Sequence, residues 1–210
     1  RRQRQMCIRD RFTPGFDAAS FCGSCECDSI EKCLSINSFE KKINENTCAI
    51  LVEPIQGEAG IRVPREGWLK ELRALCTEKN ILLILDEIQS GLGRTGKLFA
   101  YEHENIKPDG LILGKALGGA LLPISAFLSS KEIMNHFKPG SHGSTFGGNP
   151  LASKVASKAL DLLFEEKLIE NSKTMGDYFL SKLKDIDSKI IKEVRGCLLY
   201  TSDAADDRMR

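Results

Sequence analysis

Lys115 and Asp86 have residue types and a spacing that could support chemistry together. Lys115 follows the short apolar segment 110–114, and Asp86 follows the apolar segment 81–85. If both segments are strands of an open parallel sheet, both side chains lie in the crevice beyond the carboxyl ends of the strands, where ligands bind. A lysine there can form a Schiff base, and a carboxylate can keep a pyridinium nitrogen protonated. The pair therefore predicts a site for pyridoxal phosphate (PLP).

The elements that must position this pair alternate between strands and helices. Residues 47–52 form a continuous apolar run, which is typical of a strand buried on both faces. A helix that starts at 64–67 and ends at Asn80 has one apolar stripe, and the strand 81–85 follows it. This succession predicts a right-handed crossover in a mainly parallel sheet, and therefore an α/β fold.

The remaining segments extend this pattern. We expect a loop at 91–96, a short helix at 97–104, strands at 110–114 and 123–128, a helix at 130–137 and a glycine-rich loop at 138–149. Asn149 and Pro150 are good N-cap and first-turn residues for a helix to about Glu166, and a second helix runs to about Lys184. Residues 190–194 are expected to start a strand of another domain.

The two ends of the chain can be encoded by one stretch of DNA. Codons for residues 1–11 can be chosen whose reverse complement, read one base in, spells residues 197–206. That stretch matches a transposase sequencing adapter, and such segments are excluded from fold reasoning. We therefore expect 1–11 and 197–210 to be adapter-derived, 12–185 to be a partial PLP-binding large domain, and 186–196 to start a C-terminal small domain.

The charge balance and hydropathy give no sign of a nucleic-acid or membrane partner. Residues 1–11 contain five Arg and one Asp, and residues 197–210 contain two Arg and three Asp. Without them, the net charge of 12–196 is about −2 rather than the +1 of the whole chain. No apolar run approaches the roughly 20 residues that cross a bilayer.

Four cysteines, Cys22, Cys25, Cys27 and Cys33, crowd one short segment. A structural zinc site takes four ligands, usually in two paired knuckles, and no His lies near this segment to complete such a set. We expect reduced thiols in a cytosolic loop and no metal site. A truncated, non-enzymatic domain that binds a metal through these cysteines stays open as an alternative of another class.

Four segments, in this order and spacing, resemble the class III aminotransferases, which are fold-type-I PLP enzymes. They are VEPIQGEAG (52–60), LDEIQSGLGRTG (85–96), LGKALGG (113–119) and GSHGSTFGGNPLA (140–152). The resemblance is continuous over about 47–196 and weak over 12–46. It implies that the chain is part of the large domain of fold type I, an α/β domain with a mainly parallel sheet.

The resemblance implies a role for each chemical residue. Lys115 matches the Schiff-base lysine, whose freed amine moves a proton between the substrate Cα and the cofactor C4′. Asp86 matches the acid bound to the pyridine nitrogen, and Gln89 matches the donor to the phenolic oxygen. Ser144 and Thr145 suit the phosphate, and the equivalent of Thr145 reaches the phosphate of the neighbouring subunit. A homodimer with shared active sites is therefore expected.

Glu58 matches a glutamate that, in the ornithine-specific branch of the family, pairs with an arginine guarding the substrate pocket. That arginine would lie beyond Gly196. The motif GEAG at 57–60 and the spacing of 118–123 favour this branch, which moves the terminal amino group of L-ornithine to 2-oxoglutarate. The products are glutamate-5-semialdehyde and glutamate.

The segment 96–103 instead resembles acetylornithine enzymes, so these and other class III ω-aminotransferases stay open as alternatives. The upstream glycine-rich phosphate loop and the C-terminal small domain of the family are missing, and we expect the isolated fragment to be inactive. The expected location of the whole enzyme is cytoplasmic, or the mitochondrial matrix if the source is eukaryotic.

Overall fold

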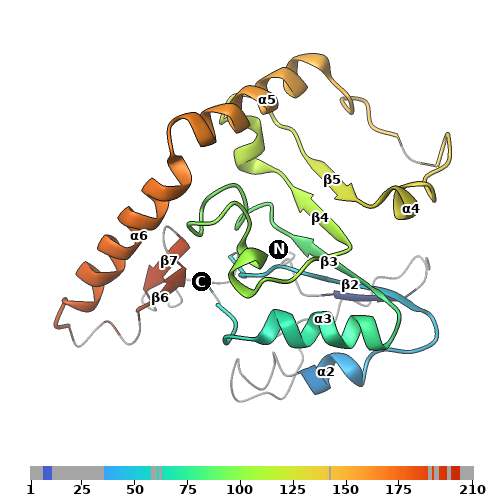
Figure 1. Ribbon diagram of the computed structural model, residues 1–210, viewed down its shortest axis with the longest axis horizontal. Coiled ribbons are helices and arrows are strands. Elements are labelled where there is room, and N and C mark those ends of the chain that lie inside the picture. The colour runs from blue at the N-terminus through green and yellow to red at the C-terminus, as the bar shows by residue number, and fades with distance from the viewer. Residues whose placement is uncertain are drawn as a thin grey trace.

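The computed structural model contains a five-stranded mixed sheet with helices packed on it (Figure 1). It describes residues 7–10, 36–57, 61, 63–141, 143–188, 191, 194–197 and 200–203. The strands are β1 (Cys7–Asp10), β2 (Thr47–Val52), β3 (Leu82–Asp86), β4 (Gly110–Leu113) and β5 (Ala126–Ser129), and they lie side by side in chain order. The β2–β3 and β3–β4 pairs are parallel, whereas β1 and β5 pair antiparallel at the two edges. The predicted α/β class and the parallel centre of the sheet are confirmed.

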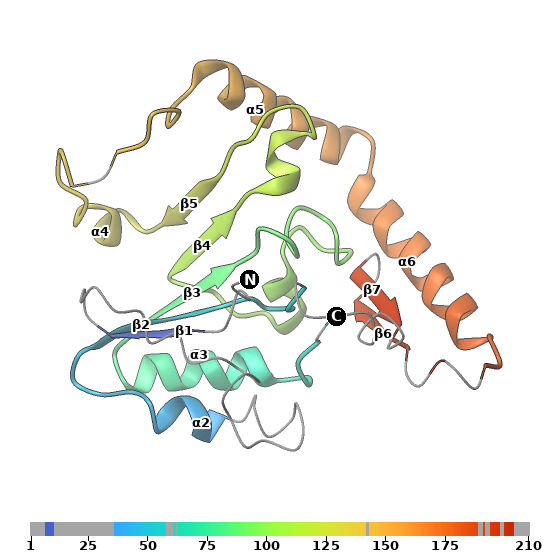
Figure 2. The ribbon, with the colours of Figure 1, turned by 180° about the vertical axis from the view of Figure 1, so that it is seen from behind.

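The helices occupy the connections between strands. They are α2 (Ile36–Glu40), α3 (Trp68–Glu78), α4 (Lys131–Met134), α5 (Pro150–Glu165) and α6 (Leu168–Lys184), with the 3₁₀ turns η1 (Ala100–Glu104) and η2 (Lys115–Gly118). A separate hairpin joins β6 (Val194–Cys197) and β7 (Tyr200–Asp203). Figure 2 shows α3 and α2 together along the β2–β3 part of the sheet, while α5 passes the far end of β4 beside η2.

The core forms where α3 lies against the central strands. Trp68 and Leu72 of α3 are fully buried, and they belong to one cluster with Leu83, Leu85 and Val52 of the sheet. The alternate residues of β3, including Leu82 and Ile84, are only half-buried. Because successive side chains of a strand point to opposite faces, the sheet has one closed face and one more open face.

Several element boundaries differ from the sequence prediction for local reasons. The first long helix begins at Trp68 rather than at 64–67, because Gly67 has a left-handed φ of 82° that interrupts the helical backbone. The following strand is shifted by one residue, since the Ile81 amide donates to the Cys76 carbonyl at the end of α3. The last sheet strand is Ala126–Ser129 instead of 123–128, and the predicted helix 130–137 is reduced to α4, capped by the Ser130 hydroxyl.

The start of α5 was predicted correctly. The Asn149 side chain accepts hydrogen bonds from the amides of Leu151 (2.9 Å) and Ala152 (3.2 Å), and Pro150 occupies the first turn. These contacts satisfy two of the amides that a helix start otherwise leaves unpaired.

Two strand pairings involve the terminal segments. β1 lies within 1–11, and β7 together with the last residue of β6 lies within 197–210. Backbone amides and carbonyls are available for such pairing in any sequence. The adapter origin and the domain boundaries therefore stay predictions.

Candidate functional site

The residues proposed for chemistry follow the carboxyl ends of two neighbouring parallel strands. Asp86 is the last residue of β3 and lies opposite Ile112 of β4. Lys115 is the first residue of η2, two positions after β4 ends at Leu113. The structure thus brings Asp86 and Lys115 to the same edge of the sheet, as their positions after two apolar runs predicted.

Asp86 is held at the start of a tight turn on the open face of the sheet. Its Oδ1 accepts a hydrogen bond of 3.0 Å from the Ile88 amide, and its side chain is half-buried. Gln89, also half-buried, lies three residues later in the same turn. One carboxylate oxygen of Asp86 is therefore anchored to its own backbone, which limits the rotation of the group.

Lys115 combines an exposed side chain with an uncommon backbone conformation. Its φ is 44°, in the left-handed region that residues other than glycine rarely adopt. The residue before it is closely packed, because a Cβ at Gly114 would lie 3.3 Å from Cγ2 of Ile88 and would displace that side chain slightly. Leu92, after β3, and Ala120, after η2, also have positive φ. Such backbone is often found at ligand sites, where the surrounding structure maintains it.

The turn η2 that carries Lys115 is fixed from both sides. Leu117 and Gly118 are buried, and α5 packs directly against η2. A Cβ at Gly119 would lie 3.3 Å from the Ala159 Cβ of α5, so the two backbones approach closely here. The lysine side chain is thus exposed but attached to a closely packed turn.

Glu87 is a buried acid to which the sequence analysis assigned no role. Its Oε2 accepts from the amide of Ala100 (2.8 Å) and the hydroxyl of Ser90 (3.1 Å), and its Oε1 accepts from the amide of Tyr101 (2.9 Å). Burial raises the pKa of the Glu87 carboxyl to about 7 despite these bonds. The only signal in the sequence was its position two residues after the buried Leu85, which predicts a side chain on the same, closed face of the sheet.

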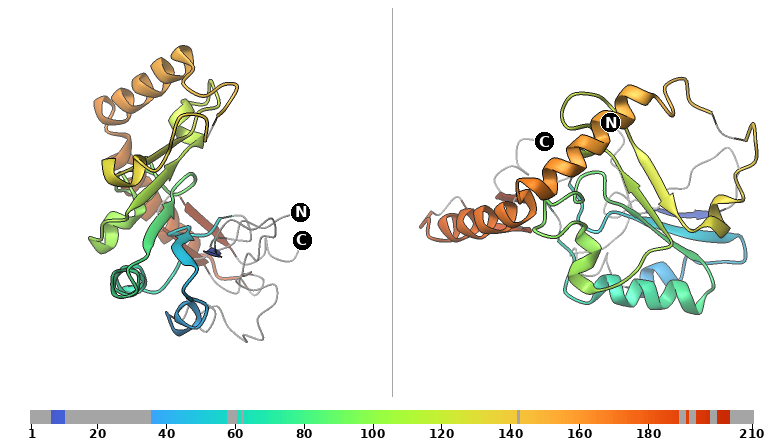
Figure 3. Two further views of the ribbon diagram at one scale, coloured as in Figure 1. Left: turned by 90° about the vertical axis from the view of Figure 1, so that its right-hand side faces the viewer. Right: turned by 45° about the horizontal axis from the view of Figure 1, so that its top comes forward.

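The glycine-rich loop does not reach this edge within the chain. Ser144 and Thr145 are exposed and lie between α4 and α5. The left panel of Figure 3, with Figure 1, shows that this part of the chain runs beyond β5, outside the edge of the sheet. The structure therefore does not bring Ser144 and Thr145 to Asp86 and Lys115 in one subunit.

Other predicted residues lie apart from this edge or outside the described residues. Glu58 and the four clustered cysteines are among the residues that the structure does not describe. Arg94 has an exposed side chain, and its carbonyl accepts a hydrogen bond of 3.1 Å from Ser172 of α6. Among the described residues, no cluster of His, Cys, Asp and Glu has metal-site geometry, and no helix is long and apolar enough to cross a bilayer.

Two surface cavities flank the sheet without including the Asp86–Lys115 pair. One, of about 390 Å³, is mainly apolar and lies between η2, the loop after β3, and the α5–α6 junction. The other, of about 360 Å³, lies at the amino ends of the strands near Arg73 and Asp109. The chemistry of the polar side chains therefore locates the candidate site better than cavity size does.

The arrangement fits the large domain of a known family. Residues 16–205 match the family model described as aminotransferase class-III. The chain belongs to the class III aminotransferases. Members of this family use PLP, and an exposed lysine and an anchored aspartate at the same edge of the sheet suit that cofactor. The cofactor class predicted from Lys115 and Asp86 is therefore confirmed.

Relatives of this class III chain include enzymes named for ornithine and for acetylornithine. Ornithine aminotransferase 2 of Staphylococcus saprophyticus is 61% identical over 165 residues, which cover 79% of this chain and 42% of that protein. Ornithine aminotransferase from Toxoplasma gondii, solved with partial occupancy of PLP at its active site, has 45% identity and a TM-score of 0.79, over 81% of this chain and 41% of that one. Acetylornithine aminotransferase from Elizabethkingia anophelis has 48% identity and a TM-score of 0.78, over 81% of this chain and 44% of that one.

The class III chain spans about two fifths of the length of the curated relatives that it matches, at 42% of the Staphylococcus saprophyticus protein. Its segment therefore carries part of an aminotransferase large domain.

Proposed function

We propose that this segment belongs to an ornithine δ-aminotransferase, which moves the terminal amino group of L-ornithine to 2-oxoglutarate. The observation that supports the reaction most strongly is the position of Asp86 and Lys115 after adjacent parallel strands. The 61% identity to a curated ornithine aminotransferase supports the substrate. When bound, PLP would supply an electron sink for the negative charge left on the substrate carbon that carries the transferred amino group, which is Cδ in ornithine.

Lys115 would hold the cofactor through Nζ until the amino group of the substrate replaced it. The freed Nζ would then remove the proton from the substrate carbon that carries the transferred amino group and return it at C4′ of the cofactor. An exposed, long side chain on a rigid turn suits both tasks, because the amine must move between two atoms while its backbone stays fixed.

Asp86 would hold a proton on the pyridine nitrogen by presenting the carboxylate that balances the positive charge. Gln89 would donate a hydrogen bond to the phenolic oxygen of the bound cofactor. Their location in one turn supports a common ligand, since the Ile88 amide already fixes the Asp86 carboxylate.

A homodimer with shared active sites accounts for the exposed glycine-rich loop. Phe146 is 81% exposed and Leu151 is 64% exposed, next to Ser144 and Thr145, and Leu121 after η2 is 76% exposed. Large apolar side chains gathered on a surface are typical of protein interfaces. A second subunit would cover them and receive Ser144 and Thr145 at its cofactor phosphate.

Glu58 sets the substrate order in this proposal. It pairs with an arginine beyond the present segment while ornithine is bound, and it releases that arginine for the α-carboxylate of 2-oxoglutarate. The cytoplasmic location of the whole enzyme and the adapter origin of 1–11 and 197–210 stay predictions. Sequencing the source DNA across both junctions tests the latter.

Turnover of ornithine and N-acetylornithine by the full-length, PLP-loaded protein tests the substrate. The proposal predicts a higher kcat/KM for ornithine. The acetylornithine alternative rests on the segment 96–103 and on the 48% identity to the Elizabethkingia anophelis structure. A clear preference for N-acetylornithine would replace our proposal with that alternative.

A further inference from the structure

Glu87 is a buried residue that joins three parts of the chain near the carboxyl ends of β3 and β4, where Asp86 and Lys115 lie. Its side chain is 1% exposed, and its two oxygens accept three hydrogen bonds, from Ala100, Tyr101 and Ser90. Its backbone amide donates to the Ile112 carbonyl of β4 (2.9 Å), and its carbonyl accepts from the Gly91 amide (3.0 Å). Glu87 is thus bonded to β4, to the turn after β3, and to the start of η1.

Asp86 and Glu87 are neighbours whose side chains belong to opposite faces of the sheet. Successive residues of extended backbone alternate in direction, so a Glu87 side chain held in the closed face directs Asp86 toward the open face. The half-buried Asp86 and the fully buried Glu87 follow this alternation. A rotation of the backbone that released Glu87 would also turn the Asp86 carboxylate.

The space around Glu87 leaves little room for such a rotation. A Cβ at Gly91 would lie 2.7 Å from the Glu87 carbonyl oxygen and 3.4 Å from Oε2, so the turn closes tightly on this residue. The Ala100 and Tyr101 amides belong to the first turn of η1, where helix amides have no partner of their own. A carboxylate is well suited to such amides, since charge-assisted bonds at a helix start are strong.

We propose that Glu87 is a positioning residue, whose bonds to η1 and to the Ser90 turn fix the direction in which Asp86 presents its carboxylate. This inference rests on the proposed PLP chemistry, because Asp86 needs that direction only if it serves the pyridine nitrogen. Glu87 does not touch the cofactor and acts through Asp86.

Glu87→Gln in the full-length protein tests the proposal, because the amide keeps the shape but places an NH₂ donor against a backbone N–H. Glu104→Gln is the matched control. Glu104 lies on the same 3₁₀ turn, and its carboxylate accepts from the Lys70 amide of α3 (3.0 Å). The measurements are amide hydrogen exchange of the apoprotein, the pH titration of the visible absorbance of the bound cofactor, and steady-state kinetics.

For Glu87→Gln we expect at least tenfold faster exchange at the Ala100 and Tyr101 amides. We also expect a shift of at least half a unit in the pH midpoint of the absorbance, and a kcat at least tenfold lower with KM changed less than threefold. Glu104→Gln should leave the midpoint and kcat unchanged. Faster exchange with an unchanged spectrum and kcat would overturn the positioning role, as would exchange that stays at the level of the original protein.

Ser90→Ala provides a second variant in case Glu87→Gln does not fold. It removes one donor and leaves both amides, so a smaller midpoint shift in the same direction is expected, and no shift would overturn the proposal. The failure of the proposed function has a different signature. In that case the unsubstituted full-length protein would show no cofactor absorbance, while the exchange measurement would still report whether Glu87 holds η1.

Discussion

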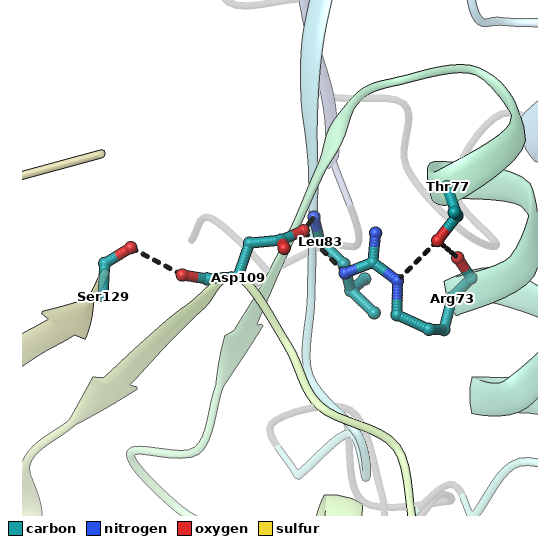
Figure 4. A network of polar contacts seen from close by, with 5 residues as sticks. All are labelled: Arg73, Thr77, Leu83, Asp109 and Ser129. Atoms are coloured by element: carbon teal, nitrogen blue, oxygen red, sulfur yellow. Dashed lines mark hydrogen bonds and ion pairs between the residues drawn. The ribbon is translucent and has the colours of Figure 1, made fainter. Parts of the chain in front are cut away.

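The two ends of the central strands use polar residues in different ways. At the amino ends, Asp109 accepts hydrogen bonds from Arg73 (2.6 Å) and from the Leu83 amide (2.7 Å), and its carbonyl accepts from Ser129 (2.5 Å), as Figure 4 shows. At the carboxyl ends, Lys115 is exposed and Asp86 is partly exposed, and Lys115, Leu92 and Ala120 have left-handed backbone. At the amino end of β3 this conformation is adopted by Asn80, a residue type that tolerates it.

The two ends of the sheet therefore differ in the role that we assign to their polar residues, stability at the amino ends and cofactor binding at the carboxyl ends. The Asp109 network joins α3, β3, β4 and β5 through hydrogen bonds between polar groups, and these bonds stabilise the folded state. The Asp86–Lys115 edge instead presents polar groups outward on strained backbone, an arrangement that proteins maintain where a ligand completes the site. A substitution should therefore affect stability at one end and turnover at the other.

The largest effect is expected for Asp86→Asn in the full-length enzyme. Loss of the carboxylate charge should lower kcat by about 10²- to 10³-fold, the usual cost of removing one electrostatic partner of the reacting group. The free energy of unfolding of the apoprotein should change little, because Asp86 is only half-buried. Steady-state kinetics and urea unfolding measure the two quantities. A large loss of stability with a normal kcat would show that Asp86 stabilises the fold and does not serve the cofactor.

The raised pKa of Glu87, at the carboxyl ends of the strands, predicts how the free energy of unfolding depends on pH. Its folded pKa of about 7 lies above the ordinary value of 4.5, so the folded state binds the extra proton between these values. The free energy of unfolding should therefore fall as pH rises from about 4.5 to 7, by up to about 3 kcal/mol, and level off above. Burial is the main cause of the raised pKa, and the charge of Glu102 adds to it, whereas the hydrogen bonds from the Ala100 and Tyr101 amides and the Ser90 hydroxyl lower it.

Urea unfolding of the original protein and of Glu87→Gln, at pH 5.5 and 7.5, measures this dependence. The original protein should lose stability between these two pH values, and the variant should lose less, because Gln does not titrate. An equal loss in both proteins would show that other groups cause it.

Asp109→Ala should weaken the amino end without affecting chemistry. It leaves the half-buried Arg73 guanidinium and the Leu83 amide without this partner, and we expect a loss of about 2–3 kcal/mol in the free energy of unfolding. The kcat of the folded full-length enzyme should stay within twofold. A fall in kcat as large as that expected for Asp86→Asn would show that the amino ends of the strands also serve turnover.

The smallest effect is expected for Thr77→Ala in the same network. The Thr77 hydroxyl accepts from Arg73 Nε (3.2 Å) and donates to the Arg73 carbonyl (2.9 Å), but it is exposed on α3. Alanine has the better helix propensity, so the two terms should nearly cancel, to within about 0.5 kcal/mol. A loss as large as that of Asp109→Ala would show that Thr77, rather than Asp109, orients the arginine.

The sequence predicted the elements whose signals are local. Residues 47–52 formed β2 with the predicted bounds, because a continuous apolar run favours a largely buried strand, although Cys48 is exposed. The positions of Asp86 and Lys115 after such runs were sufficient to place both at one edge of the sheet. Asn149 predicted the start of α5 because its capping contacts lie within three residues.

The missed features depend on contacts that are distant in sequence. The helix expected at 97–104 starts at Ala100, where the carboxylate of Glu87, thirteen residues earlier, satisfies the first amides of η1. No nearby residue indicates that partner. The antiparallel direction of β5 likewise depends on its pairing with β4, where Gly110 lies opposite Ser129. The roles of Gln89, Ser144, Thr145 and Glu58 stay predictions.

The identity of the lysine that binds PLP tests the central claim most directly. Borohydride reduction of the full-length, PLP-loaded protein turns the lysine–cofactor bond into a stable link, and peptide mass spectrometry then locates it. Our account predicts one labelled lysine, Lys115, and no label in Lys115→Ala. A label on another lysine, or one that survives this substitution, would contradict the assignment of the β3–β4 edge as the catalytic site.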